Sequence, residues 1–152
     1  MNHRKWWAIA AIIWMTAIFF FTQLPYFTGE KTSEVIQKVV VAEQKTINKT
    51  PSTDHTDINK LNLIVRKATH IVVFGILAIL LYKALETNRF AYILSWTLTV
   101  LYAITDEWHQ SFMPGRVAAY QDVLFDSVGA LVALFILVLI RNNYKLVKNI
   151  RT

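Results

Sequence analysis

Residues 123–140 read VLFDSVGALVALFILVLI, an apolar run whose polar positions, Asp126 and Ser127, lie near its start. A helix needs about 20 mainly apolar residues to cross the roughly 30 Å hydrocarbon layer of a bilayer, and this run is close to that length. Basic residues follow it at Arg141 and Lys145. The run therefore predicts a membrane-spanning helix with a positively charged flank.

Three earlier stretches have the same apolar character, at about residues 6–24, 66–83 and 90–105. The stretches at 66–83 and 90–105 are short for a membrane span, but flanking polar side chains that extend toward the membrane surface would allow them to cross. Hydrophobic residues make up 55% of the 152-residue chain, which exceeds the usual share in a soluble domain. We therefore expect an all-α fold, a bundle of four transmembrane helices in a single domain over residues 1–152.

The charge pattern narrows the function classes. Lys and Arg number 16 against 10 Asp and Glu, but no basic stripe accompanies a soluble module, so we expect no nucleic-acid partner. Because the chain has no cysteine, disulfides, iron–sulfur clusters and thiolate zinc sites are excluded. The positive residues instead flank the predicted spans.

The same positive residues predict the orientation. If both termini are cytoplasmic, the inner side carries many basic residues and one acid, Glu86, as the positive-inside rule requires. The outer loop, residues 27–65, is balanced in charge. A cleaved signal peptide is the weaker alternative for the first stretch, because its apolar run is too long and no small-residue cleavage site follows. The inner basic residues are Arg4, Lys5, Lys83, Arg89, Arg141, Lys145, Lys148 and Arg151.

Two connecting segments have their own signals. Within the outer loop, apolar residues such as Val35, Ile36 and Val39 recur at helical spacing, which predicts an amphipathic segment on the membrane surface. The connector before the last span contains Pro114 and Gly115, a turn signal. We expect it to form a short loop of re-entrant type, with Arg116 as a counter-ion for nearby carboxylates.

Polar residues from three separate segments fall at one membrane level, at the outer ends of the predicted spans. Asp122 and Asp126 share one helix face because they are four positions apart. Charged groups inside a membrane are costly and face the bundle interior, where they find partners. Arg66, Asp106 and Gln110 lie at this level. We expect six further residues of this level to meet in one outer-facing cleft: His70, Glu107, His109, Arg116, Asp122 and Asp126.

These segments resemble a known family. The runs RKATH at residues 66–70, TDEWHQSFMPGR at 105–116 and DVLFDSVG at 122–129 are similar to those of the VanZ-like bacterial membrane proteins. Thr22 and Gln23 stand where that family often has serines, a mild departure. The resemblance implies a multi-pass protein of the bacterial cell membrane and a role in resistance to glycopeptides of the teicoplanin type. It carries over no catalytic residue.

Three classes of function fit the predicted cleft. The first is a module that binds a membrane lipid, a lipid-linked cell-wall precursor or a glycopeptide antibiotic, with Arg66, Arg116 and Gln110 contacting an anionic headgroup. The second is an enzyme acting on a lipid headgroup, with Glu107 and His109 as the acid–base pair. The third, an ion-coupled partner of a larger complex, is the least supported because four short helices leave little room for a pathway.

The candidate catalytic residues could also bind a metal ion, or they could have a purely structural role. The candidates are His70, Asp106, Glu107, His109, Asp122 and Asp126. Their oxygen and nitrogen atoms are suitable ligands for a divalent metal ion. They could equally form ion pairs with Arg66, Lys67 and Arg116 that order the bundle and perform no reaction.

Overall fold

The computed structural model describes residues 3–23, 38, 55–112 and 120–151. Within these residues the fold is all-α, as expected, with four helices: α1 (His3–Gln23), α3 (His55–Leu85), α4 (Ala91–Gln110) and α5 (Tyr120–Arg151). The expected amphipathic segment around residues 35–47, and the expected re-entrant loop with Arg116, lie outside the described residues.

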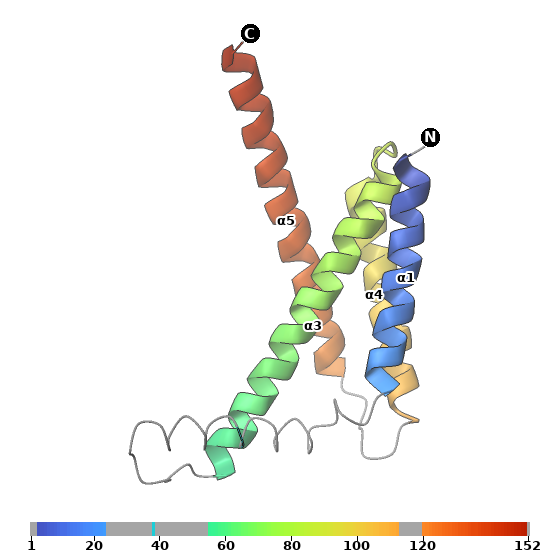
Figure 1. Cartoon of the computed structure of the whole chain (residues 1–152), viewed down its shortest axis with the longest axis vertical. Helices are drawn as coiled ribbons and strands as arrows, with labels where there is room; N and C mark the ends of the chain where they lie inside the picture. Colours follow the sequence, from blue (N-terminus) through green and yellow to red (C-terminus); the bar gives the residue numbers. More distant parts are fainter. Residues whose placement is uncertain (1–2, 24–37, 39–54, 113–119, 152) are drawn as a thin grey trace.

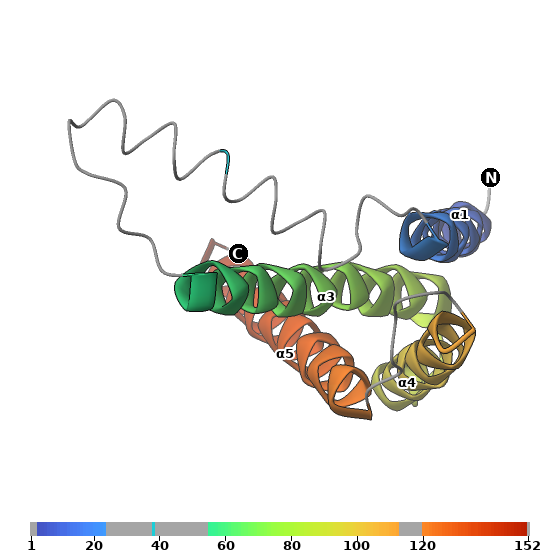
Figure 2. The same ribbon diagram turned by 90° about the horizontal axis from the view of Figure 1, so that it is seen from below.

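The long helix α3 is the centre of the bundle. It packs against α1, α4 and α5, and α4 also contacts α1 and α5. Figure 2 shows α1 and α5 on different sides of α3. The start of α1 and the end of α5 lie at the same end of the molecule, at the top of Figure 1. The end of α1, the end of α4 and the start of α5 therefore gather at the other end.

Three of the helices are long and apolar enough to cross a membrane, over His3–Thr22, Leu63–Leu85 and Tyr120–Tyr144. Helix α4 has 20 residues, which is sufficient length, but it is not among the described helices that are apolar enough to cross. Serine and threonine recur along it and Asp106 and Glu107 lie near its end. The chain is thus a multi-pass membrane protein, while a fourth crossing by α4 stays a prediction.

The helices extend beyond the apolar runs from which we predicted them. α3 begins at His55 instead of residue 66, and α4 continues through Asp106 to Gln110 instead of ending at residue 105. Hydropathy marks only the part of a helix inside hydrocarbon. Backbone hydrogen bonding continues past that limit, because a helix also forms where its side chains reach water or other protein groups.

Small residues let α3 and α5 approach closely where they cross. A Cβ atom added to Gly129 would lie 2.5 Å from the Ile71 carbonyl oxygen, and one added to Gly75 would lie 3.2 Å from the Ala133 Cβ. Such close contact between backbones is typical of helix pairs in membranes. Gly129 therefore permits the close packing of α5 against α3 beside Ile71.

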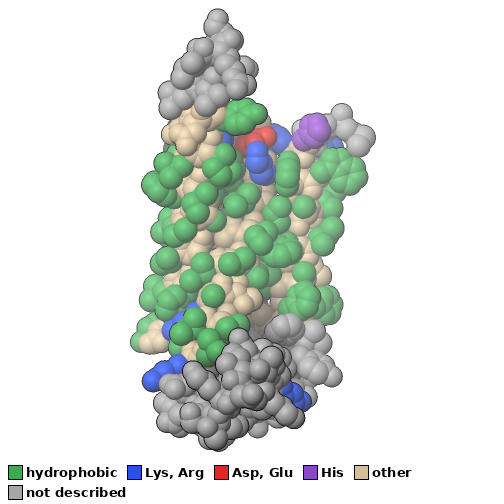
Figure 3. All heavy atoms as spheres, turned by 60° about the vertical axis from the view of Figure 1, so that its left-hand side comes forward, with side chains coloured by type: hydrophobic (Ala, Val, Ile, Leu, Met, Phe, Trp, Pro, Cys, Tyr) green, Lys and Arg blue, Asp and Glu red, His purple; other side chains and the backbone are tan. Residues whose placement is uncertain are grey.

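The outer surface of the bundle is strongly apolar. Hydrophobic side chains cover the face in Figure 3, and its charged side chains gather toward the two ends. Trp6, Trp7 and Trp108 are exposed near helix ends, Trp108 by 66%. This is the placement expected of interfacial anchors. The surface is therefore suited to lipid rather than to water.

Candidate functional site

The polar residues meet where α1 and α4 end and α5 begins. Here a pocket of about 380 Å³ lies between α1 and α3, and we call it the α1–α3 pocket. Its walls are mainly apolar, and Phe21 and Val65 are exposed at its edge. Five polar side chains line it, those of Thr22, Arg66, Thr69, His70 and Asp106. The pocket thus joins a long apolar surface to a small polar end.

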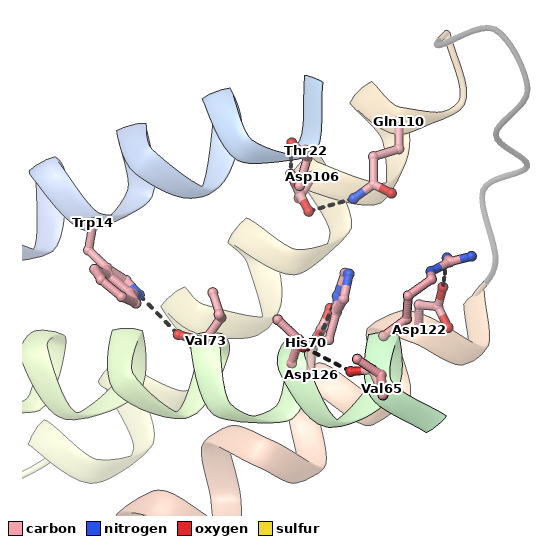
Figure 4. A network of polar contacts seen from close by, with 11 residues as sticks. Trp14, Thr22, Val65, His70, Val73, Asp106, Gln110, Asp122 and Asp126 are labelled. Carbon is pink, nitrogen blue, oxygen red and sulfur yellow. Dashed lines mark hydrogen bonds and ion pairs between the residues drawn. The ribbon is translucent and has the colours of Figure 1, made fainter. Parts of the chain in front are cut away.

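Asp106 anchors the first polar group. It is only 3% exposed, and its carboxylate accepts a hydrogen bond from Gln110 Nε2 at 2.7 Å and one from the Thr22 hydroxyl at 3.3 Å. The four-residue spacing of Asp106 and Gln110 on α4 places both on one face, and Thr22 reaches them from α1 (Figure 4). These bonds offset part of the cost of burying a carboxylate.

Thr22 is a site residue that the sequence reasoning missed. Its position marked the end of the first apolar run, and we noted it only as a departure from the serines of similar proteins. Its hydroxyl lies 2.9 Å from the Phe19 carbonyl oxygen and 3.3 Å from Asp106 Oδ1. Since one hydroxyl has one hydrogen, the two acceptors share or alternate as its partner. The contact with Phe19 lies within α1 and follows from helical spacing, whereas the contact with Asp106 joins α1 to α4 and could not be predicted from spacing.

Two pairs of residues bind α3 to α5. His70 Nδ1 lies 3.2 Å from Asp126 Oδ1, and Arg66 Nη2 lies 3.7 Å from Asp122 Oδ2. Within each helix the two members are four positions apart, so the pairs follow one another along a single contact line. Figure 4 shows His70 beside Asp126, with Asp122 toward the start of α5.

The two pairs differ in burial. Asp126 is 1% exposed, and its Oδ2 atom has no hydrogen-bond partner within the described part of the chain. The side chains of Arg66 and Asp122 are 41% and 17% exposed. A carboxylate inside a low-dielectric bundle interacts strongly with its one partner, whereas an exposed pair is screened. His70 is therefore held firmly by Asp126, and Arg66 is free to exchange Asp122 for another anion.

Lys67 lies on a different surface from Arg66. Its ammonium is 4.0 Å from the centre of the Phe125 ring on α5. This is a cation–π distance, and Lys67 does not line the α1–α3 pocket. Of the two adjacent basic residues, Arg66 alone faces the pocket.

His109 and Glu107 occupy other positions. The His109 ring packs against Phe19, with ring centres 4.5 Å apart, and lines a second hollow of about 390 Å³ between α1 and α4. Asp106 borders both this hollow and the α1–α3 pocket. Glu107 is buried on α4. Direct contacts or a shared pocket thus bring together six of the predicted residues: Arg66, His70, Asp106, Gln110, Asp122 and Asp126. His109 lines a different hollow from His70, and Asp106 borders both.

The described residues contain no group of three or more His, Asp or Glu arranged to hold a metal ion. Asp106, Asp122 and Asp126 each have a different partner, respectively Gln110, Arg66 and His70. The divalent metal that the sequence allowed has no ligand set in this part of the molecule.

Comparison with known families supports the sequence resemblance. The family described as VanZ/LLP1 matches residues 7–141, which is most of the chain. No curated protein and no solved structure matches it. The matched region includes every side chain of the polar site just described, from Thr22 to Asp126.

Proposed function

The chain belongs to the VanZ/LLP1 family, and we propose that it acts in the bacterial cell envelope by binding the anionic headgroup of a lipid-linked component at the outer leaflet. The observation that carries this proposal is the α1–α3 pocket. An apolar wall of Ile18, Val73 and Phe74 ends at Arg66 and His70, which suits a molecule with an apolar chain and an anionic head. Such amphiphiles are present in the surrounding bilayer.

Arg66 is the residue best placed to take the headgroup. Its guanidinium is already paired with a carboxylate, Asp122, at 3.7 Å, and it is partly exposed at the edge of the pocket. Arginine binds phosphate and carboxylate groups through two parallel hydrogen bonds, so an incoming phosphate would replace Asp122 with little rearrangement. Arg116, the second proposed clamp residue, lies outside the described residues.

Resistance to a teicoplanin-type glycopeptide would follow from this binding in one of two ways. The bound component would be the cell-wall precursor that the antibiotic recognises, or the pocket would take the acyl chain of the antibiotic itself. Both ligands combine an apolar chain with a polar head. Binding assays with a polyprenyl phosphate and with teicoplanin, run separately, distinguish the two ligands.

The test compares two neighbouring substitutions in protein reconstituted in lipid nanodiscs. Arg66→Gln should weaken polyprenyl phosphate binding by about tenfold or more, the effect of losing a charge-assisted hydrogen bond. Lys67→Gln removes an equal charge from the neighbouring residue, whose ammonium lies against the Phe125 ring and not in the pocket. It should change the affinity for polyprenyl phosphate by no more than about twofold. Equal losses in the two variants would reject the α1–α3 pocket as the headgroup site.

A second function, an acid–base enzyme acting on the headgroup, is favoured by the His70–Asp126 pair. A buried carboxylate on Nδ1 orients the imidazole and leaves Nε2 as the nitrogen available for proton transfer, and His70 lines the pocket. Glu107 and His109 remain the alternative acid–base pair.

Two histidine variants separate these assignments. If His70 is the base, His70→Gln should retain polyprenyl phosphate binding and abolish any conversion of a bound lipid-linked substrate detected by mass spectrometry, and His109→Gln should retain both. Conversion that survives His70→Gln and is lost in His109→Gln would assign the reaction to the other pair. Absence of conversion in the unsubstituted protein would leave the binding module and reject the enzyme.

A further inference from the structure

A second polar pocket lies at the opposite end of the bundle. It has a volume of about 360 Å³ and is formed by the end of α3, the α3–α4 turn, the start of α4 and the second half of α5. In Figure 1 this is the end where α5 leans away from α3. Its polar lining includes the side chains of Glu86, Asn88, Arg89, Arg141 and Asn142. We call it the Arg89–Arg141 pocket.

The two arginines come from different elements and are each held against an aromatic ring. The Arg89 guanidinium lies 4.5 Å from the centre of the Phe90 ring, and that of Arg141 lies 5.6 Å from the centre of the buried Tyr82 ring. Stacking on a ring fixes the plane of a guanidinium and leaves its N–H edge available to an acceptor. Within the described ranges, neither arginine forms an ion pair with a carboxylate.

The remaining charge near this pocket is largely neutralised. Glu86 borders it, but its carboxylate lies 3.6 Å from Lys83 Nζ. The side chain of Asn88 accepts a hydrogen bond from the Phe90 backbone N–H at 2.9 Å, so the turn is fixed at the start of α4. The pocket therefore presents two positioned cations, neither of which forms an ion pair with a carboxylate of the described residues.

We propose that the Arg89–Arg141 pocket binds the phosphate of an anionic phospholipid. The candidate span on α3 ends at Leu85 and that on α5 ends at Tyr144, so Arg89 and Arg141 lie near the level at which lipid headgroups begin. Arginine pairs with phosphate oxygens in a bidentate manner, and basic pockets between transmembrane helices bind anionic headgroups. The site is separate from the α1–α3 pocket and does not depend on the function proposed there.

Bound lipid would also have a structural effect. A phosphate held by Arg89 and Arg141 would bridge the α3–α4 turn to α5 at the point where α5 departs from the bundle. Anything that binds the folded state selectively stabilises it, so the thermal midpoint should rise with the anionic lipid. The shift of the thermal midpoint can therefore be measured in addition to lipid binding.

The experiment uses native mass spectrometry of the full chain in detergent micelles with added phosphatidylglycerol, phosphatidylcholine or inorganic phosphate. The unsubstituted protein should retain phosphatidylglycerol in preference to phosphatidylcholine, and inorganic phosphate at the same concentration should not displace it. Arg141→Gln should weaken retention by about tenfold, the scale of one lost charge-assisted hydrogen bond. Arg141→Lys, which keeps the charge but loses the planar fork, should fall between the two.

Lys5→Gln is the matched control. Lys5 is an exposed basic residue at the same end of the molecule that does not line the pocket. It should leave lipid retention and the lipid-dependent rise in the thermal midpoint unchanged. If Lys5→Gln and Arg141→Gln lower retention equally, the basic residues act only as a general positive field and the proposed site is wrong.

Two further outcomes would also overturn the proposal. Displacement by inorganic phosphate would identify a site for free phosphate rather than for lipid. Retention unaffected by both Arg141→Gln and Arg89→Gln would place any bound lipid elsewhere. Should Arg141→Gln fail to fold, Arg89→Gln tests the same pocket from the α3–α4 turn.

Discussion

At the scale of single residues, the main distinction is between buried and exposed ion pairs that look alike in sequence. Asp122 and Asp126 are four positions apart on one face of α5, and each faces a basic residue of α3. Asp126 is almost wholly buried, while the Arg66–Asp122 pair reaches solvent. The two carboxylates should therefore differ in what they contribute to stability.

We expect Asp126→Ala to lower the free energy of unfolding by about 3–5 kcal/mol, the usual loss when one partner of a buried pair is removed. Asp122→Ala should lower it by no more than about 1 kcal/mol, as for exposed pairs. Unfolding of the purified variants in mixed micelles measures both values. Similar losses in the two variants would show that His70 and Asp126 do not form the buried pair described.

The sequence singled out several residues of this polar cluster and named Arg66 as a possible partner of its carboxylates, but it did not determine which side chains pair. His70, Asp106, Asp122 and Asp126 were recognisable because charged groups in apolar runs need a structural or chemical reason. The role of Thr22 was not recognisable, since threonine is common at helix ends and its partner Asp106 is 84 positions away. The separation of His109 from His70 also depends on how α4 is rotated against α1, which periodicity alone does not determine.

At the scale of the helices, the crossing of α3 and α5 depends on Gly129. A methyl group there would meet the backbone of Ile71, with its nearest atom at 2.5 Å, so one helix must move. We expect Gly129→Ala to lower the free energy of unfolding by about 1–3 kcal/mol, the range for overpacked interiors. Gly75→Ala is the matched control because its nearest contact is a side-chain methyl group at 3.2 Å.

The smaller loss should occur in Gly75→Ala, measured by the same unfolding assay. The reverse order would contradict the described crossing. Because Gly129 lies one turn beyond Asp126, Gly129→Ala should also disturb the His70–Asp126 contact, and a changed His70 imidazole signal in NMR spectra would report it.

The helices themselves were predictable and their limits were not. Each apolar run became a helix, since a chain in hydrocarbon must satisfy its backbone hydrogen bonds internally. The runs marked only the lipid-facing core of each helix, so α3 starts at His55 and α5 extends to Arg151. The lower hydropathy of α4 has a packing reason: Ser95, Thr99 and Asp106 are buried against the other helices rather than exposed to lipid.

At the scale of the whole molecule, the orientation in the membrane remains a prediction that follows from the arrangement of the helix ends. The start of α1 and the end of α5 lie at one end, together with Arg4, Lys83, Arg89 and Arg141. By the positive-inside rule this basic end should be cytoplasmic, which puts the α1–α3 pocket at the outer leaflet.

Reporter fusions at Asn48 and Thr152 test this orientation. The fusion at Asn48 should report the outer side and that at Thr152 the cytoplasm. If both reporters indicate the same side of the membrane, the basis for an outer-leaflet ligand is lost, although the geometry of the pocket is unchanged.

The central claim is that the α1–α3 pocket holds an amphiphile, and photo-crosslinking tests it most directly. A polyprenyl phosphate with a photoreactive group in its chain is irradiated with the reconstituted protein, and the modified peptides are identified by mass spectrometry. The account predicts labelling of α1 and α3 around Phe21, Val65 and Val73, which line the pocket, and loss of that labelling in Arg66→Gln but not in Lys67→Gln. Labelling mainly on the exposed face of α5 around Leu131 and Phe135, or labelling of α1 and α3 that Arg66→Gln leaves unchanged, would contradict it.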